Sequence, residues 1–256
     1  MIWIGGPPGA GKSTIASRLA RRHGLRWHCT DTTTWSHRDR AIAAGNAAAI
    51  HWEALPVGER GSAEDAELLA MSLHAERGQM VLDDLAALPP APAVIVEGTV
   101  LPAWAVHAGV IDRARVLWLR PFPEFQARAL AAKGSARDRL TVLLTETIAA
   151  EWDVLPVLDV GSGVESVIGN VERLLRPALS AGPHARDRGE RRGLLREANL
   201  AVVEQVRAGS RRPWAAVDPE TARRRFVCEC GDPDCDADLD RSVAEAAAGP
   251  LIVHPA

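Results

Sequence analysis

Residues 5–14 read GGPPGAGKST, and Gly6, Gly11, Lys12 and Ser13 stand there at the fixed positions of the P-loop pattern. The apolar run of residues 1–4 precedes this stretch and an amphipathic segment follows it, which is the strand, loop and helix context that a P-loop requires. Glycine lets the backbone turn so that successive N–H groups point at phosphate oxygens, and a helix N-terminus favours an anion. The stretch therefore predicts a nucleoside triphosphate site.

The predicted phosphate cradle takes in the whole loop. It comprises Gly6, Pro7, Pro8, Gly9, Ala10, Gly11, Lys12, Ser13 and Thr14. We expect Lys12 to reach the β- and γ-phosphates and to be catalytic, and the hydroxyl of Ser13 to ligate Mg²⁺. The expected cofactors are thus ATP and Mg²⁺, although the loop alone leaves GTP open.

Composition and charge exclude several classes of protein. The 256 residues are 47% hydrophobic and carry a net charge of −3, so no strong positive field favours nucleic acid as a partner. No apolar run is long enough to span a bilayer, and the P-loop begins too near the N-terminus for a removable signal peptide. We therefore expect a cytoplasmic protein without a membrane partner; its oligomeric state is not indicated.

Asp31 is the candidate general base. A helix is predicted over Lys12–His23, ending at Gly24, and a short strand over Leu25–Cys29. Ligands of open α/β sheets gather outside the carboxyl ends of the strands, so an acid that follows the second strand is expected near the γ-phosphate. There it would take the proton of an acceptor hydroxyl. The alternative is that Asp31 caps the next helix, with Thr32, Thr33 and Thr34 as rival caps.

Glu97 ends a second informative strand. Residues 93–99 form a β-branched run that suits a strand buried on both faces, and we expect it beside the P-loop strand. A carboxylate at the end of such a strand has few structural reasons to be there. Glu97 is predicted to hold Mg²⁺ through water or, alternatively, to bind the acceptor. Gly98 is expected to allow the close approach of a ligand.

A P-loop that opens the chain, with Asp31 after the second strand and Glu97 after the third, resembles the small P-loop kinases. This group includes shikimate kinase, gluconate kinase, adenylate kinase and chloramphenicol phosphotransferase, and the resemblance covers residues 1–178. It implies ATP-dependent phosphoryl transfer to a hydroxyl of a small molecule, which is a metabolite or an antibiotic. In several of these kinases the acid after the second strand handles the acceptor hydroxyl.

The resemblance also places the acceptor site and a lid. Residues 35–52 read as helix with a break at Gly45–Asn46, and Trp35 and Arg40 are the main candidates for acceptor binding. Other residues of this segment that a polar pocket could use are His37, Arg38, Asp39, His51 and Trp52. The alternative is a solvated helix face with two tryptophans in the core. A lid with phosphate-binding arginines is expected after a strand at residues 115–120. Its candidates are Arg120, Arg128, Arg137 and Arg139, with Arg128 assigned to the nucleotide and Arg137 to catalysis.

A last strand at residues 155–160, followed by a loop that passes the adenine, completes five strands that alternate with helices. This pattern predicts an α/β fold with a doubly wound, five-stranded parallel sheet of P-loop kinase type. Two helix starts are expected from capping boxes, one at Ser62 with Asp65 and one at Ser162 with Glu165.

The composition changes near residues 181–183, which predicts a separate module over residues 184–256 after a kinase-like domain over residues 1–178. Its Cys228, Cys230 and Cys235 have metal-ligand spacing and predict a structural zinc site, with His254 as fourth ligand. Asp232, Asp234 and His184 are alternatives for that fourth place. The tail also resembles a cysteine-bearing C-terminal segment of many actinobacterial proteins.

Two functions remain from the sequence. The first is an ATP-dependent kinase that phosphorylates a hydroxyl-bearing small molecule. The second is a nucleotide-dependent regulatory ATPase whose C-terminal zinc module binds a protein or a nucleic acid; an arginine-rich stretch favours it, but the acidic residues that follow largely offset this charge.

Overall fold

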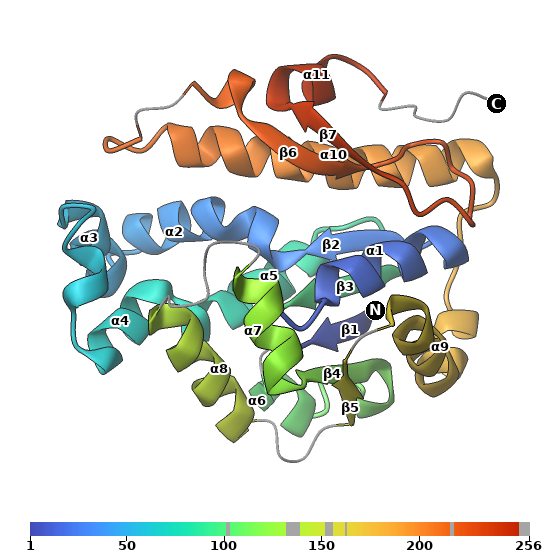
Figure 1. Cartoon of the computed structure of the whole chain (residues 1–256), viewed down its shortest axis with the longest axis horizontal. Helices are drawn as coiled ribbons and strands as arrows, with labels where there is room; N and C mark the ends of the chain where they lie inside the picture. The colour runs from blue at the N-terminus through green and yellow to red at the C-terminus, as the bar shows by residue number, and fades with distance from the viewer. Residues whose placement is uncertain (101–102, 132–138, 152–155, 162, 216–217, 251–256) are drawn as a thin grey trace.

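Five parallel strands form the sheet at the centre of the N-terminal part of the chain (Figure 1). They are β1 (Ile2–Gly5), β2 (Arg26–Cys29), β3 (Val94–Gly98), β4 (Val116–Pro121) and β5 (Val157–Val160), in the order β2-β3-β1-β4-β5. In the β1 and β3 register Ile4 lies opposite Glu97 and Gly5 opposite Gly98. The prediction of a five-stranded parallel sheet, with the strand of Glu97 beside the P-loop strand, is confirmed.

This computed structural model describes residues 1–100, 103–131, 139–151, 156–161, 163–215 and 218–250. Three residues of the sequence predictions, Ser162, Arg137 and His254, lie outside these ranges. No helix within the described ranges has both the length and the apolarity to cross a bilayer.

Helices cover both faces of the sheet, so the sheet is doubly wound. On one face α1 (Lys12–His23) and α9 (Val164–Ala181) pack on a core that includes Ile2 and Ile4. On the other face α5 (His74–Ala86), α6 (Ala103–His107) and α8 (Arg139–Glu151) pack on a core around Trp3. Side chains of a strand alternate between faces, and this alternation divides β1 between the two cores.

Helix α1 ends as the sequence predicts, at Gly24, which has the left-handed φ of 62° and donates its N–H to the last turn. Two other helix starts differ from the expectation. Helix α4 (Asp65–Ser72) begins after Glu64 without a side-chain cap, so the predicted capping box at Ser62 is wrong. Helix α9 begins after Gly163, also without a side-chain cap, and continues through Pro177 to Ala181.

An arm of helices extends beyond the carboxyl ends of β2 and β3 (Figure 1). It contains α2 (Thr34–Ala43), α3 (Ala47–Ala54), α4 and the start of α5. The predicted break at Gly45–Asn46 is confirmed, because the Asn46 side chain caps α3 by accepting the N–H of Ala49 at 2.9 Å. Helix α7 (Pro123–Ala131) follows β4 and precedes α8. Short 3₁₀ turns occur at residues 30–33, 60–62, 113–115 and 219–221.

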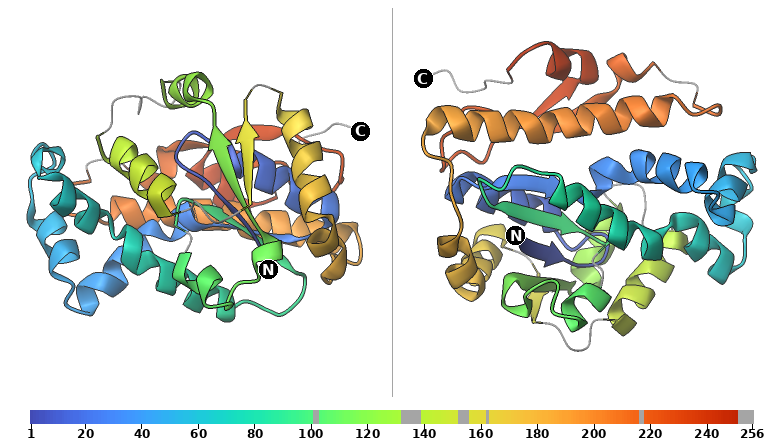
Figure 2. Two further views of the ribbon diagram at one scale, coloured as in Figure 1. Left: turned by 90° about the horizontal axis from the view of Figure 1, so that it is seen from below. Right: turned by 180° about the vertical axis from the view of Figure 1, so that it is seen from behind.

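The C-terminal part forms a second layer over the edge of the sheet (Figure 2). Helix α10 (Arg188–Ser210) packs across β2, the turn at residues 30–33 and α2. The antiparallel pair β6 (Arg223–Val227) and β7 (Asp238–Ser242) and helix α11 (Val243–Ala248) share a small apolar core with α10 that includes Val203 and Phe226. The edge strand β2 is thereby covered by a helix, which protects its unpaired backbone groups.

Candidate functional site

The P-loop curls around the ammonium of its lysine. Lys12 is 7% exposed, and its Nζ donates to the carbonyl of Pro7 at 3.0 Å. Gly11, which precedes α1, has a φ of 81°, and a Cβ there would meet nothing within 4 Å. The loop therefore combines a backbone conformation that favours glycine with open space at the N-terminus of a helix, which is where a phosphate group can lie.

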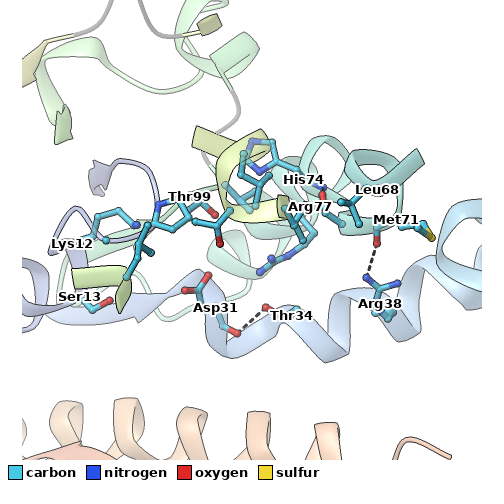
Figure 3. Close-up of a pocket in the computed structure, with 18 of the residues that line it drawn as sticks. Lys12, Ser13, Asp31, Thr34, Arg38, Leu68, Met71, His74, Arg77 and Thr99 are labelled. Carbon is cyan, nitrogen blue, oxygen red and sulfur yellow. Dashed lines mark hydrogen bonds between the residues drawn. The ribbon is translucent and has the colours of Figure 1, made fainter. Parts of the chain in front are cut away.

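A cavity of about 440 Å³ begins at this loop and runs toward the arm of helices (Figure 3). Lys12 and Ser13 lie at one end, Met71 and Arg38 lie toward the other, and Asp31 and Arg77 lie between them. The cavity thus joins the phosphate-binding motif to a space of the size that small-molecule sites have.

Asp31 presents its carboxylate to this cavity (Figure 3). The N-cap of α2 is Thr33, and no side chain caps it; Asp31 contributes only its backbone carbonyl, which accepts the hydroxyl of Thr34 at 2.8 Å. The alternative that Asp31 caps the next helix is therefore wrong, and none of the rival threonines supplies a side-chain cap either. The carboxylate is left available to whatever occupies the cavity.

Glu97 is fully buried, and neither of its carboxylate oxygens has a hydrogen bond of good geometry among the described residues. Burial raises the pKa of this carboxyl, the negative charge of Asp31 raises it further, and the nearby Lys12 opposes the shift. The Cys29 thiol and the Ser13 hydroxyl also lie close enough to lower the pKa slightly. Buried carboxylates normally have partners, because an unpaired charge in a protein interior is costly. An orphaned carboxylate beside Lys12 and Ser13 fits a bound cation or its water shell.

Gly98 serves a different purpose from the one expected. A Cβ at this position would lie 1.8 Å from the hydroxyl oxygen of Thr30 and 3.0 Å from its Cβ. Glycine here allows β3 and the 3₁₀ turn after β2 to approach each other. Thr30, and not a ligand, therefore lies against Gly98. This close packing brings Asp31 near Glu97.

Glu97→Gln is expected to stabilise the ligand-free protein at neutral pH by about 0.5–2 kcal/mol, the usual range for a single stabilising substitution, because it removes a buried charge. The folded-state pKa of Glu97 lies above its ordinary 4.5, so the folded protein binds the proton more tightly than the unfolded chain. Stability is therefore lost as the pH rises from about 4.5 through the folded pKa. Melting temperatures between pH 4 and 8 should fall for wild type across this window and stay flatter for the variant. A variant that melts lower at pH 8 would contradict the orphaned carboxylate.

Arg77 lies between Asp31 and a hydrogen-bonded series of side chains, His37, Asp84 and Arg40, which the sequence did not indicate. It is 6% exposed, donates to the carbonyl of Thr30, and its Nε donates to Nδ1 of His37 at 3.3 Å. Since a guanidinium has no acceptor, Nδ1 of His37 accepts and the proton lies on Nε2, which contacts Asp84 at 2.6 Å. Arg77 is thus held in one orientation beside the cavity.

Arg40 does not lie at the cavity, contrary to the prediction. Its guanidinium is 41% exposed and pairs with Asp84 at 2.5 Å, so it supports the hydrogen-bonded series behind Arg77. Trp35, the other predicted acceptor residue, does line the cavity, as do Trp52 and Arg38. We therefore remove Arg40 from the candidate acceptor site, keep Arg38, and add Arg77, which the sequence did not indicate.

Two tryptophans, Trp35 and Trp52, line the cavity, and a third packs against them. Trp35, Trp52 and Trp214 pack with ring centroids 5.6–5.8 Å apart. Trp214 follows α10, and the neighbouring Arg212 bonds to Glu53 at 2.7 Å and to the backbone carbonyl of Trp35 at 3.0 Å. The C-terminal part of the chain therefore holds the two tryptophans that line the cavity.

A second cavity of about 220 Å³ lies on the other side of the P-loop. Gly9, Gly11 and Thr14 line both cavities, and the second is completed mainly by apolar groups of α7, β5 and α9, among them Phe125 and Val160. Gly161, which follows β5, also lines it, at the place where the sequence predicts that a loop passes the adenine.

The lid arginines are mostly engaged elsewhere. Arg120 pairs through two bonds with Asp159, at 2.6 and 3.1 Å, and Arg139 pairs with Asp65. Arg128 is exposed on α7 and lines neither cavity, while Arg137 lies outside the described residues. Of the four candidates, the three described ones thus contribute nothing to the walls of either cavity.

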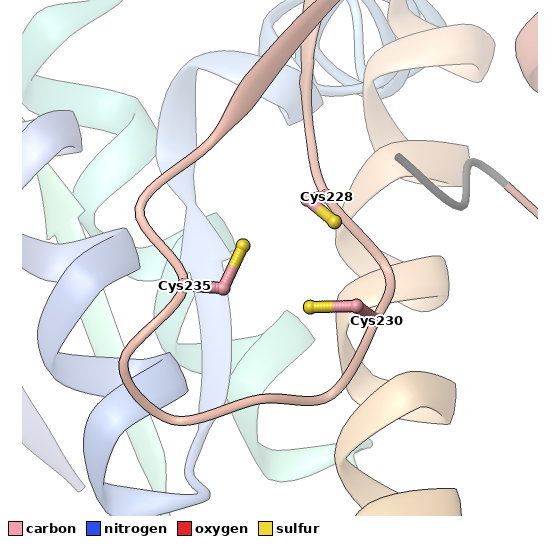
Figure 4. A group of neighbouring side chains, drawn as sticks. All are labelled: Cys228, Cys230 and Cys235. Carbon is pink, nitrogen blue, oxygen red and sulfur yellow. The ribbon is translucent and has the colours of Figure 1, made fainter. Parts of the chain in front are cut away.

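The sulfur atoms of Cys228, Cys230 and Cys235 lie within 4.8 Å of one another (Figure 4). Gly231 turns the chain with a φ of 71°, and Arg188 fixes the loop through the carbonyl of Cys230 at 2.8 Å. Burial alone would raise the pKa of Cys230, yet the N–H of Asp232 and the neighbouring thiols lower it overall, while that of Cys235 rises to about 12, chiefly through burial.

Three thiolates so arranged fit a metal ion. A tetrahedral zinc with bonds of about 2.3 Å separates its sulfurs by roughly 4 Å, so little movement is needed. Within the described residues the group comprises these thiols alone. His184 contacts the carbonyl of Leu179 at 2.7 Å and does not belong to it, nor do Asp232 and Asp234; His254 lies outside the described residues.

Scanned against models of protein families, the chain matches none, and a search of curated proteins likewise returns no match.

Proposed function

We propose that the protein is an ATP-dependent phosphotransferase of the small P-loop kinase type, which moves the γ-phosphoryl group to a hydroxyl of a small molecule. The observation that carries this proposal is the joint placement of the P-loop, Asp31 and Glu97 at the carboxyl ends of β1, β2 and β3, where the P-loop and Asp31 line one cavity and Glu97 is buried next to Lys12 and Ser13. A P-loop alone would serve any nucleotide-dependent protein. The carboxylate of Asp31 caps no helix and lies in a cavity large enough for an acceptor, which favours group transfer.

Each residue has a proposed role on this basis. Lys12 and the backbone N–H groups of the loop bind the phosphates, and the apolar cavity beside Phe125 takes the base. Ser13 and, through water, Glu97 hold Mg²⁺, which neutralises charge on the β- and γ-phosphates. Asp31 accepts the proton of the acceptor hydroxyl while the oxygen of that hydroxyl bonds to the γ-phosphorus. The bond between the γ-phosphorus and the leaving oxygen of ADP breaks in the same step. Arg137 remains the proposed lid arginine.

We assign a structural zinc ion to Cys228, Cys230 and Cys235, with His254 as the proposed fourth ligand. Cysteines that bind a metal rather than form disulfides suit a reducing, cytoplasmic compartment. The zinc would fix the loop between β6 and β7, which contacts α1 through Arg18 and Asp236 at 3.2 Å. Its contribution is to the fold of the C-terminal part rather than to phosphoryl transfer.

The zinc assignment predicts about one equivalent of metal in the purified protein and a lower melting temperature after chelation, because such binding energy is largely folding energy. Cys230→Ser should lose the metal, and Cys29→Ser, which changes a thiol on β2 instead, should retain it. Elemental analysis of the three proteins provides the measurement. Metal retained in His254→Ala would reassign the fourth ligand, and metal-free wild type prepared without chelator would remove the site.

The direct test of the phosphotransferase is a screen of hydroxyl-bearing compounds for ADP release, followed by mass spectrometry of the product to locate the new phosphate. Compounds should include polyols, hydroxy acids and antibiotics. An acceptor that raises ADP release and gains one phosphate supports the proposal. ATP hydrolysis that no acceptor stimulates would instead support the alternative.

That alternative is a nucleotide-dependent regulatory ATPase. It draws support from the contact of α10 with the turn that carries Asp31, since a nucleotide that moves this turn would also move the C-terminal layer. The layer would then present its zinc module to a protein or nucleic-acid partner. We place it second because the cavity beyond Asp31 has no role in it.

A further inference from the structure

Arg38 is a buried cation with unused hydrogen-bonding capacity. It lies on α2, is 4% exposed, and lines the main cavity. Its Nη2 donates to the carbonyl of Met71 at 2.7 Å, whereas its Nε and Nη1 have no hydrogen-bond partner among the described residues. Buried donors on a charged group are costly when unpaired, so the site lacks an acceptor that would complete it.

The surroundings of Arg38 add positive charge rather than remove it. Its guanidinium lies 4.0 Å from the centroid of Trp52. Burial lowers its pKa to about 10; Glu53 opposes this shift, and the nearby Arg212, Arg60 and Arg77 add to it. Glu53 itself already accepts bonds from Arg212 and from Trp214, at 2.7 and 3.2 Å. Arg212 also pairs with Asp39 at 2.8 Å, and Arg77 lies near Asp31 and Asp84. Glu53 is thus the acid that acts on both Arg38 and Arg60, and its oxygens already accept these two other bonds.

The described side chains that line the cavity also carry more positive than negative charge. Beyond the P-loop its charged side chains are Arg38, Arg77 and Asp31, and Asp31 is the proposed base. His74 stays neutral, because burial lowers its pKa to about 4. An uncharged polyol would leave two guanidinium groups facing a single carboxylate. An anionic group on the acceptor would balance them.

Part of this wall is apolar. Trp35, Trp52, Leu68, Met71 and Leu144 line the cavity together with Arg38 and Arg77, and Thr34, Ser72, Thr99 and Thr141 add hydroxyl groups. The apolar side chains suit a molecule with a hydrocarbon or aromatic body. The charged contacts are concentrated at the two arginines and at Asp31, where an acceptor would be oriented.

We propose that the acceptor is an amphiphilic anion, with an apolar body against Trp35 and Trp52, a carboxylate or phosphate group on Arg38 and Arg77, and its reactive hydroxyl at Asp31. This assignment rests on the proposed function for the role of the hydroxyl, but the anion site can be tested without turnover. Arg38 and Arg77 then select the substrate by charge, since they leave an uncharged analogue with unpaired cations.

The test compares four probes of one shape: phenylacetate, phenyl phosphate, phenylacetamide and benzyl alcohol. Binding to the full chain is followed by tryptophan fluorescence, with saturating MgADP present so that anions cannot occupy the P-loop. Phenylacetate or phenyl phosphate should bind about 10–100-fold more tightly than the two neutral probes, the scale of a hydrogen bond to a charged group. The anion that binds more tightly shows whether the acidic group of the acceptor is a carboxylate or a phosphate.

Variants assign the effect to the residue. Arg38→Met should remove most of the preference for anions, and Arg173→Met, which changes an exposed arginine of α9, should retain it. If Arg38→Met does not fold, judged by its melting curve and MgADP binding, Arg38→Lys replaces it. That variant keeps a charge but loses the planar donors, so it should bind anions more weakly than wild type.

The outcomes separate this proposal from the proposed function. MgADP binding with equal affinity for charged and neutral probes, or no probe binding at millimolar concentration, would overturn the anion site and leave the nucleotide site standing. An undiminished anion preference in Arg38→Met would overturn the assignment to this residue. An anion preference that Arg38→Met removes, in a protein that does not bind MgADP, would keep the anion site and refute the phosphotransferase.

Discussion

Lys12→Ala is expected to remove phosphoryl transfer while the protein keeps its fold. The ammonium lies within the curl of the P-loop on the carbonyl of Pro7, and we assign it to the phosphates. Loss of one such electrostatic stabiliser costs on the order of 10²–10³-fold in kcat, and more is expected here because Lys12 also binds the ground state. Steady-state ADP release with the acceptor found in the screen provides the measurement.

Two controls accompany this variant. Its melting temperature should stay close to that of wild type at pH 4, where Glu97 is protonated, because Lys12 belongs to neither apolar core. At higher pH the variant should melt somewhat lower, because Lys12 no longer offsets the charge of the buried Glu97. Lys12→Arg keeps the charge on a longer, planar group and should retain weak nucleotide binding. Turnover at the wild-type rate in a folded Lys12→Ala protein would refute the nucleotide site, whatever the acceptor.

The parts of the molecule that the sequence predicts well are those set by local chemistry. The P-loop, the Gly24 cap and the cysteine loop each depend on a few neighbouring residues, and short spacing alone brings their groups together. The run at residues 93–99 reads as a buried strand because its β-branched side chains suit both faces of a parallel sheet. Its uninterrupted pattern also identified Glu97 as an anomaly.

The acceptor side depends on contacts between distant segments, and these were not predictable. Arg77 reads as an ordinary helical residue, and only its packing against His37 and the turn at Thr30 gives it a role. Trp214 joins Trp35 and Trp52 across more than 150 residues of sequence. A helical periodicity in the sequence predicts that a residue lies on a helix, but it does not predict which other element that residue contacts.

Arg40 shows how such a prediction fails. A polar residue on the predicted acceptor helix was assigned to the substrate, yet Arg40 lies two positions after Arg38 and so points about 200° away around the helix. One faces the cavity and the other faces Asp84. The capping box predicted at Ser62 fails because α4 begins two residues later, after Glu64.

Asp31→Asn is expected to leave nucleotide binding intact and to lower kcat by about 10²–10⁴-fold, the usual contribution of a general base. The carboxylate caps no helix and is exposed to the cavity, so an amide of the same shape should be accommodated without loss of fold. Asparagine cannot take the hydroxyl proton. Turnover and MgADP affinity, measured on the same preparation, separate the two effects.

A second measurement distinguishes catalysis from structure. The charge of Asp31 helps to raise the pKa of Glu97, so Asp31→Asn should lower that pKa. The destabilisation that Glu97 causes above pH 4.5 should then shrink, and the variant should melt at or above the wild-type temperature at pH 8. Asp83→Asn, which changes an exposed carboxylate of α5, should alter neither turnover nor this pH dependence. A folded Asp31→Asn protein with a near-normal rate would contradict the base, and one that melts well below wild type would give Asp31 a structural role instead.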